Sequence, residues 1–211
     1  MKSYSSVDNK QIPLDFKLLS HLPDSGFFVE AGANDGFTQS NTLLLEKFKN
    51  WNGLLIEPSP VAFEKCKQIR SDKNIFVNCA LVADDSVTSV KGNFEKGSLM
   101  ASIDGIRQED SQVIEVPATT LSSIVKKHNI QKIDFMSLDV EGYELEVLKG
   151  IDLNSSWAPN IFLIEIYNDK LKDIVEFLKT NYNFICNFTN YNKKDNPGWD
   201  GTHNDYLFIK K

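Results

Sequence analysis

Short apolar runs alternate with amphipathic stretches along most of this chain. An apolar run that ends in turn residues predicts a buried strand, whereas apolar residues spaced three and four apart predict a helix. Leu171, Ile174 and Leu178 follow the helical spacing, and Pro60 lies where a proline opens a helix at little cost. The expected strands are 27–33, 54–56, 75–82, 87–94, 113–116, 133–138, 161–166, 184–188 and 206–209. The expected helices are 40–49, 59–70, 120–129, 143–149 and 169–180.

The order of these elements predicts an α/β fold with a single domain over residues 1–211. Strands that alternate with helices pair in a mostly parallel sheet, and the helices cover both faces of that sheet. The last two strands, 184–188 and 206–209, are joined by a loop alone, so they are expected to pair antiparallel at one edge. Residues 1–22 are interpreted as an N-terminal extension. Residues 95–112 are interpreted as a lid loop over the active site, because their small residues allow movement.

Composition and charge narrow the classes of function. The formal net charge of −6 gives no general attraction for a phosphate backbone, so a nucleic-acid partner is not expected. The three cysteines are an odd number without Cys-x-x-Cys spacing, which argues against a disulfide framework or a zinc site. No apolar stretch reaches the roughly 18 residues of a membrane span, and residues 1–13 lack the apolar run of a signal peptide. A cytoplasmic protein is therefore the expectation.

The first candidate site is the turn after the first expected strand, in the run FFVEAGANDG at 27–36. In open α/β sheets the ligand crevice lies beyond the carboxyl ends of the strands, and Gly32 and Gly36 let the backbone approach a ligand closely. Their Gly-x-x-x-Gly spacing differs from the Gly-x-Gly-x-x-Gly spacing of dinucleotide-binding turns. The carboxylates of Glu30 and Asp35 would repel a pyrophosphate and attract an ammonium or a sulfonium. The turn therefore favours S-adenosylmethionine over a dinucleotide, and a plain strand-to-helix turn is the alternative.

The second candidate site is Glu57, which ends the second expected strand and precedes Pro58. It follows the glycine turn by about 20 residues, where a carboxylate can accept hydrogen bonds from the ribose hydroxyls of an adenosine. Capping of the next helix is the alternative for Glu57. Asn78 and Ala80 lie in the last part of the third expected strand, 75–82, and Asn78 can border an adenine or cap a turn.

The third candidate site follows the strand 133–138, where Asp139 and Glu141 reach the carboxyl end of the sheet. Carboxylates there can take a proton from an acceptor hydroxyl or hold a divalent ion. Glu144 is interpreted as an acid of the first helical turn, where the helix dipole favours negative charge. Glu165 ends the next expected strand, so its carboxylate is expected to face the same site as Asp139.

Two further features concern metal binding and proton transfer. Asp139, Glu165 and Asn168 together offer the oxygen ligands that magnesium accepts. Acids at strand ends are also common without a metal, so a divalent cation is left open and is not predicted. His203, with Asp205 nearby, is interpreted as a solvated loop histidine, and a proton acceptor is the alternative.

These segments, taken in order, resemble the FkbM family of methyltransferases. The resemblance rests on FVEAGANDG at 28–36, IEP at 56–58 and KIDFMSLDVEGYE at 132–144. It implies a Rossmann-like class I methyltransferase fold, which is a mostly parallel seven-stranded sheet with an antiparallel edge strand and helices on both faces. It also implies S-adenosylmethionine as the methyl donor and O-methyl transfer to sugar-like or natural-product hydroxyls. The first turn departs from the commoner Asn-x-Gly form of the family, since it carries Asp35.

The resemblance also assigns roles, with Glu30, Gly32, Asn34 and Glu57 on the cofactor and Asp139 and Glu141 at the reaction centre. We therefore expect an S-adenosylmethionine-dependent O-methyltransferase that acts on a hydroxyl of a sugar, a glycan or another small molecule. A dinucleotide-dependent oxidoreductase and a non-catalytic nucleotide-binding module are the alternatives, and the oligomeric state is not predicted. The expected cofactor-binding residues are Glu30, Gly32, Ala33, Asn34, Asp35, Gly36, Glu57, Pro58, Asn78 and Ala80. The expected catalytic residues are Asp139, Glu141 and Glu165.

Overall fold

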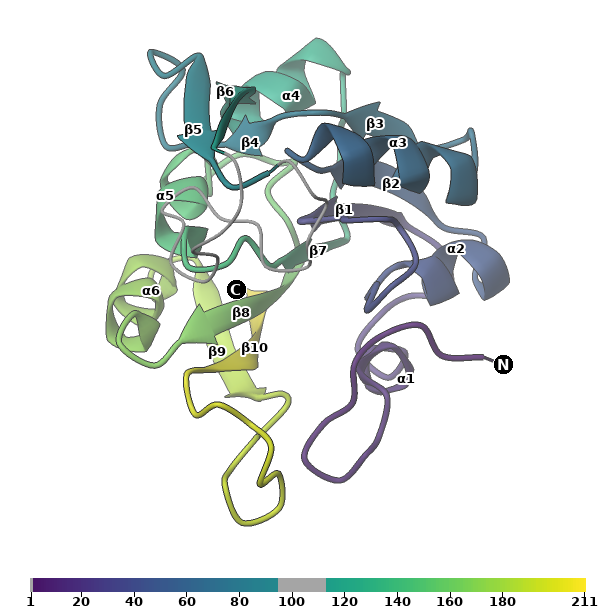
Figure 1. Cartoon of the computed structure of the whole chain (residues 1–211), viewed down its shortest axis with the longest axis vertical. Helices are drawn as coiled ribbons and strands as arrows, with labels where there is room; N and C mark the ends of the chain where they lie inside the picture. The colour runs from purple at the N-terminus through teal and green to yellow at the C-terminus, as the bar shows by residue number, and fades with distance from the viewer. Residues whose placement is uncertain (1, 95–112) are drawn as a thin grey trace.

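The computed structural model describes residues 2–94 and 113–211, and helices alternate with strands through most of them (Figure 1). No helix in this part of the chain has the length and the apolar composition that a bilayer-crossing helix requires. The helices are α1 (Leu14–Leu18), α2 (Leu43–Phe48), α3 (Pro60–Ile69), α4 (Leu121–Lys127), α5 (Glu144–Lys149) and α6 (Leu171–Leu178). The strands are β1 (Phe27–Ala31), β2 (Asn52–Ile56), β3 (Ile75–Val77), β4 (Ala80–Leu81), β5 (Ser89–Gly92), β6 (Ile114–Thr119), β7 (Phe135–Leu138), β8 (Ile161–Tyr167), β9 (Tyr182–Asn187) and β10 (His203–Lys210).

Seven of these strands form one sheet in the order β3-β2-β1-β7-β8-β10-β9. The pairs from β3 to β8 are parallel, and β10 runs antiparallel to both β8 and β9. This arrangement confirms the expected fold class and the antiparallel pairing of the last two strands. The antiparallel strand β10 lies one position inside the edge, because β9 pairs with its outer side.

Helices cover both faces of the sheet, and each face has its own core. One core joins α4, α5 and α6 to the sheet, and the other joins α1, α2 and α3 to the opposite face. In Figure 1, α5 and α6 accordingly lie to the left of the sheet, whereas α1 and α2 lie to its right. The central strands β1, β7 and β8 are buried along most of their length, which explains why they are almost continuous apolar runs.

The expected strand at 75–82 is in fact two strands that belong to different sheets. β3 is the edge of the large sheet, whereas β4 pairs with β6 in a small sheet of order β4-β6-β5. The side-chain amide of Asn78 donates to the backbone oxygens of Glu57 and Pro58 at 2.7 and 3.0 Å, which fixes the chain between the two strands. The mostly apolar run at 75–82 does not reveal such a break, because both the half-buried β3 and the buried β4 consist of apolar residues.

Residues 1–22, interpreted as an extension, include a short helix that packs on the sheet. Leu14 and Leu18 of α1 are fully buried in the core on that face. The buried carboxylate of Asp15 accepts the backbone N–H of Tyr4 at 2.7 Å, which ties the first residues to this helix. The expected lid at 95–112 lies outside the described residues.

Gly32 has a backbone conformation that other residues rarely adopt. Its φ is +86°, and a Cβ added there would lie 1.8 Å from the backbone oxygen of Asp139. We expect Gly32→Ala to lower the free energy of unfolding by about 3 kcal/mol, because it adds backbone strain and pushes β7 away from β1. Gly198→Ala is the control, since a Cβ there meets no atom within 4 Å. Urea unfolding measures both variants, and equal stability of the two would contradict this reading.

Candidate functional site

The candidate site lies beyond the carboxyl ends of β1, β2, β7 and β8. The strand register aligns Ala31 of β1 with Leu138 of β7, and Leu138 with Ile164 of β8. Asp139 and Glu165 each follow one of these aligned residues, so both carboxylates reach the same edge of the sheet. The sequence prediction that these two acids face one site is consistent with this register.

The turn after β1 is held by backbone contacts to its neighbours on either side. The N–H groups of Gly32 and Ala33 both donate to the backbone oxygen of Ile56 at 3.0 Å, and the N–H of Asp139 donates to Ala31 at 3.1 Å. Gly32, Asn34 and Gly36 all have positive φ angles, which curl the chain into a tight loop. The loop is therefore pinned between the ends of β2 and β7, where a ligand in the crevice would meet it.

Glu57 lies at the end of β2 and faces this turn. Its Oε2 accepts the N–H of Asn34 at 2.8 Å, and its Oε1 accepts the N–H of Ser59 at 2.8 Å. Burial raises the pKa of Glu57 to about 7, although these two N–H donors act against the rise. Ser59 itself caps α3, because its side chain accepts the N–H of Ala62. The cap of α3 is thus Ser59, and Glu57 joins that cap to the glycine turn.

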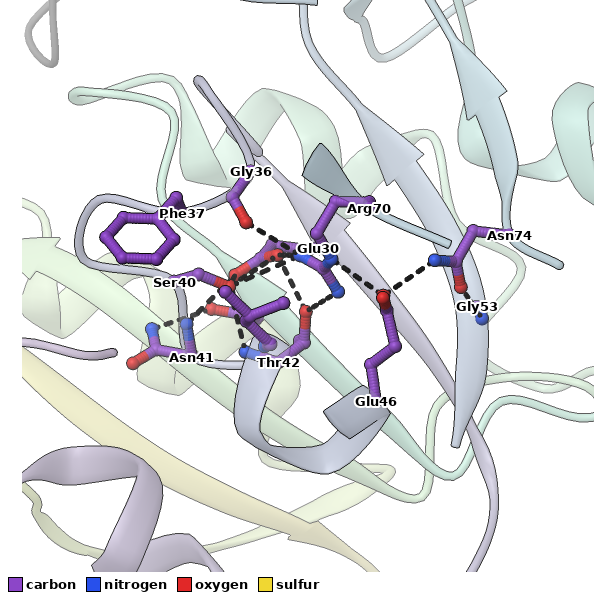
Figure 2. Close-up of polar contacts among 12 residues, drawn as sticks. Glu30, Gly36, Phe37, Ser40, Asn41, Thr42, Glu46, Gly53, Arg70 and Asn74 are labelled. Atoms are coloured by element: carbon purple, nitrogen blue, oxygen red, sulfur yellow. Dashed lines mark hydrogen bonds and ion pairs between the residues drawn. The ribbon is translucent and has the colours of Figure 1, made fainter. Parts of the chain in front are cut away.

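Glu30 is placed differently from what the sequence suggested. It is buried at the end of β1, where it forms an ion pair with Arg70 of 3.0 Å. Figure 2 shows the carboxylate surrounded by Arg70 and by the polar residues that begin α2. Both of its oxygens are already engaged, by Arg70 and by hydrogen bonds from Ser40, Asn41 and Thr42.

The same arginine holds a second carboxylate and the turn itself. Arg70 Nε contacts Glu46 of α2 at 2.7 Å, and its Nη1 donates to the backbone oxygen of Gly36 at 3.4 Å. Burial alone would raise the pKa of Glu46, but Arg70 outweighs it and holds the pKa below its usual range. The argument that Glu30 presents free negative charge to a ligand was therefore wrong in its physical basis, because Arg70 compensates that charge.

Asp35 and Asn78, two other expected ligand contacts, also bind the protein itself. Asp35 accepts the N–H groups of Phe37 and Thr38 at 2.9 and 2.7 Å in a local turn. Burial would raise its pKa, but these hydrogen bonds outweigh the effect and lower it. Asn78 uses its amide on the backbone after β2, as described above, which matches the turn-capping alternative. Pro58 follows Glu57 directly after β2, and Ala80 begins β4 two positions after Asn78.

Three carboxylates converge at the carboxyl ends of β7 and β8, and we call Asp139, Glu141 and Glu165 the acidic cluster. One oxygen of each lies within 4.8 Å of one oxygen of the other two. Glu141 has a positive φ of 56°, and its Oε2 accepts the hydroxyl of Tyr167 at 2.9 Å. Glu144 lies behind the cluster at the start of α5, fully buried, and its Oε1 accepts the N–H groups of Val140 and Gly142. These two bonds agree with the interpretation of Glu144 as an acid that stabilises the first helical turn.

Asp139 and Glu165 of the acidic cluster hold protons more tightly than usual, because they lose solvent and lie among other carboxylates. Although Asp139 reaches the surface, the surrounding protein displaces much of its solvent and raises its pKa, and the charges of Glu141, Asp205 and Glu144 raise it further. Loss of solvent also raises the pKa of Glu165, with Asp139 as the largest charge contribution. A raised pKa makes each of these carboxylates a better proton acceptor.

His203 differs from its sequence interpretation. It is not in a solvated loop: it opens β10, and its Nε2 lies 3.3 Å from Glu165 Oε1. The amide nitrogen of Asn168 donates to the backbone oxygen of Gly201 at 2.7 Å, and a role for its oxygen as a metal ligand stays a hypothesis. Carboxylate oxygens of Glu141 and Glu165 converge with one of Asp139. The sequence feature that could have placed His203 in a strand was the apolar run that follows it. That run was too short to show where the strand begins.

Comparisons with known proteins agree with this geometry. The model of the Methyltransferase FkbM domain family matches residues 30–186, which include the β1 turn, Glu57 and the acidic cluster. A crystal structure of methyltransferase FkbM from Methylobacillus flagellatus KT has a TM-score of 0.55 and 14% identity, covering 88% of this chain and 44% of that chain. At that identity the structural similarity concerns the fold.

Two curated relatives are similar in sequence. Methyltransferase 1 of Beauveria bassiana (strain ARSEF 2860) is 24% identical over 158 residues, covering 62% of this chain and 60% of that protein. Methyltransferase sdnD of Sordaria araneosa is 24% identical over 173 residues, covering 64% of this chain and 63% of that protein. The chain thus spans about three fifths of the length of these relatives.

The buried arginine network makes a prediction about stability. Arg70→Met leaves the carboxylates of Glu30 and Glu46 buried without their cation, which should lower the free energy of unfolding by about 3–5 kcal/mol. Lys67→Met in α3, the helix that Arg70 caps, is the matched control, because Lys67 is exposed and its contacts with Glu64 and the Phe63 ring lie at the surface, so its loss should cost under about 1 kcal/mol.

The difference in free energy of unfolding between the wild type and Arg70→Met should also become smaller as the pH falls from 8 to 5. Without Arg70 the burial of Glu46 is no longer opposed by a cation and raises its pKa in the folded protein, so the folded state takes up more protons than the unfolded state and gains stability on acidification. Wild-type protein shows the reverse trend for Glu46, whose pKa is lowered. Urea unfolding at several pH values measures this, and a deficit that stays constant with pH would contradict the role of the buried charges.

Proposed function

Because this chain belongs to the FkbM methyltransferase family, we propose that it transfers a methyl group from S-adenosylmethionine to a hydroxyl oxygen of a sugar, a glycan or another small molecule. The observation that supports this proposal is the acidic cluster at the carboxyl edge of the sheet, where the backbone of Asp139 contacts Ala31 just before the glycine turn that Glu57 holds through Asn34. The glycine turn and Glu57 have the groups to bind the donor, and the neighbouring acidic cluster has carboxylates that can take the acceptor proton.

The residues on the donor side fit S-adenosylmethionine. Each carboxylate oxygen of Glu57 accepts one backbone N–H, from Asn34 or from Ser59. Each oxygen keeps a second lone pair, which can accept a hydrogen bond from a ribose hydroxyl. The tight turn from Gly32 to Gly36 brings backbone close to the crevice, and the acidic cluster favours a positively charged ligand. When bound, this cofactor supplies an electrophilic methyl group and a sulfonium charge that is lost on transfer.

The residues on the acceptor side match an oxygen nucleophile. A hydroxyl must lose its proton as it attacks, and Asp139 and Glu165 have pKa values raised toward the range in which a carboxyl accepts a proton effectively. The same negative charge would repel the phosphates of a nucleic acid, which favours a small hydroxylated acceptor. A dinucleotide cofactor is disfavoured for the same reason, because its pyrophosphate would meet these carboxylates.

Cofactor binding tests the proposal directly. We expect isothermal titration to show one site for S-adenosylmethionine and none for NAD at millimolar concentration. Ribose hydroxyls donate to the ionised form of Glu57, whose pKa is about 7, so affinity should rise roughly tenfold from pH 6 to pH 8.

Glu57→Gln should weaken binding by about 1.5–3 kcal/mol and remove that part of the pH dependence. Binding of NAD alone would refute the donor, and unchanged affinity in folded Glu57→Gln would refute the role of Glu57.

Turnover tests the acceptor side. Asp139→Asn keeps the size of the side chain but loses the base, so turnover should fall by roughly 10²–10⁴-fold while cofactor affinity stays within about twofold. Release of S-adenosylhomocysteine, measured with a panel of sugars and polyols, gives the rate. Asp169→Asn is the control, because Asp169 is an exposed surface carboxylate. If Asp139→Asn turns over at the wild-type rate, the proton must instead go to Glu141 or Glu165.

A further inference from the structure

A run of side chains in contact leads from the acidic cluster to the protein surface. Glu165 Oε1 lies 3.3 Å from His203 Nε2, and the other ring nitrogen of His203, Nδ1, lies 2.9 Å from the hydroxyl of Thr202. That hydroxyl donates to Asp200 Oδ1 at 2.7 Å, and the Asp200 side chain is 48% exposed. We call these four residues, Glu165, His203, Thr202 and Asp200, the relay.

The fold holds the His203 ring firmly in this run. The antiparallel register places Asp205 opposite Glu165 and His203 opposite Tyr167, so Glu165 and His203 are diagonal neighbours on one face of the β8–β10 pair. The ring packs against that of Tyr167, with centroids 5.7 Å apart. The backbone oxygen of His203 also accepts the indole N–H of Trp199 at 3.0 Å. The imidazole is therefore fixed between the acidic cluster and Thr202.

The hydrogen-bond directions along the relay follow from the number of protons available. Thr202 has one hydroxyl proton, and the carboxylate of Asp200 can only accept, so that proton points to Asp200. The Thr202 oxygen must then accept from His203, which places a proton on Nδ1. Nε2 faces Glu165, and two lone pairs would repel each other across that contact. One further proton must therefore lie between Glu165 and His203, either on the carboxyl or on the imidazole.

Other groups around the pair favour retention of this proton. The ionisable side chains that surround it come from every neighbouring element: Asp139 and Glu141 after β7, Glu144 of α5, Tyr167 of β8, Asp205 of β10, and Tyr191 and Asp200 of the β9–β10 loop. Most of them are carboxyls, and negative charge nearby stabilises a bound proton. The electrostatics thus agree with the hydrogen-bond geometry.

We propose that the relay carries the proton of the acceptor hydroxyl from the acidic cluster to solvent. As the methyl carbon leaves the cofactor sulfur and bonds to the acceptor oxygen, the hydroxyl proton passes to Asp139 and on to Glu165. Glu165 gives its proton to Nε2, Nδ1 gives one to Thr202, and the hydroxyl proton of Thr202 leaves through Asp200. One proton enters and one leaves, so the number of protons in the relay is unchanged. The transfer leaves the imidazole proton on Nε2 and the Thr202 hydroxyl turned toward Nδ1, so the hydroxyl must rotate and the proton must return to Nδ1 before the next turnover.

This inference rests on the proposed methyl transfer to a hydroxyl, but the shared proton exists in the protein alone and can be observed there. His203 and Thr202 do not touch the acceptor in this scheme; they are positioning residues that act through Glu165. The chain has only three histidines, His21, His128 and His203, so imidazole nitrogen NMR on the intact protein resolves each of them. His203→Gln identifies the His203 signals.

We expect Nδ1 of His203 to stay protonated across the pH range. We expect the second imidazole proton of His203, the one shared with Glu165, to be lost at a higher pH than the second proton of His21 and His128. Glu165→Gln should move the titration midpoint of His203 down by about one pH unit or more, and Thr202→Val should abolish the preference for a proton on Nδ1. Glu146→Gln is the matched control, because Glu146 lies on the exposed side of α5 paired with Lys149, and it should change nothing. Unaltered signals of His21 and His128 show that each variant is folded.

Two results would overturn the relay. The first is a His203 that titrates like the other two histidines and does not respond to Glu165→Gln. The second is selective broadening of the His203 signals by stoichiometric Mn²⁺, which would assign the acidic cluster to a metal ion. Failure of the wild type to bind S-adenosylmethionine in titration would count against the proposed function instead, and the two failures are therefore distinguishable. With an accepted hydroxyl substrate, Thr202→Val should lower kcat and leave KM unchanged.

Discussion

The buried ion pairs of Arg70 are the interaction on which the rest of the site depends. One guanidinium joins the end of β1 through Glu30, the α2 helix through Glu46, and the glycine turn through the backbone oxygen of Gly36 (Figure 2). Burying such charges is costly unless each hydrogen bond is satisfied, and here Ser40, Asn41 and Thr42 complete the shell of Glu30. The turn is therefore held in one shape before any ligand arrives.

The carboxylates at the carboxyl edge of the sheet fall into two groups with different chemistry. Glu30 and Glu46 are neutralised by Arg70 and serve the architecture. Loss of solvent and the carboxylates around them raise the pKa values of Asp139 and Glu165, so they are suited to take up protons. Glu57 lies between these extremes, since it is buried, has a pKa of about 7 and holds the turn through Asn34. The same edge of the sheet thus carries two different groups. The glycine turn and Glu57 are held rigidly on the proposed donor side, and the carboxyls on the proposed acceptor side can take up protons.

The sequence predicted most of the large sheet, because a parallel sheet buried on both faces requires apolar runs such as β1 and β7. It also predicted that Asp139 and Glu165 face one site, since the ends of parallel strands meet at one edge. It could not predict the partner of Glu30, because Arg70 is forty positions away and resembles an ordinary helix-terminal arginine. The place of His203 was missed for a similar reason: antiparallel register decides it, and no local pattern encodes that register.

The break between β3 and β4 and the packing of α1 were also beyond the sequence. Both depend on tertiary contacts, which override a mostly apolar pattern at 75–82 in one case and determine the packing of a short N-terminal segment in the other.

The central claim, that the donor and acceptor sides meet at this edge of the sheet, is tested most directly by a crystal structure with bound S-adenosylhomocysteine. The account predicts ribose hydroxyls on Glu57 and the sulfur facing Asp139. A product whose ribose does not contact Glu57 and whose sulfur faces away from Asp139 would contradict it.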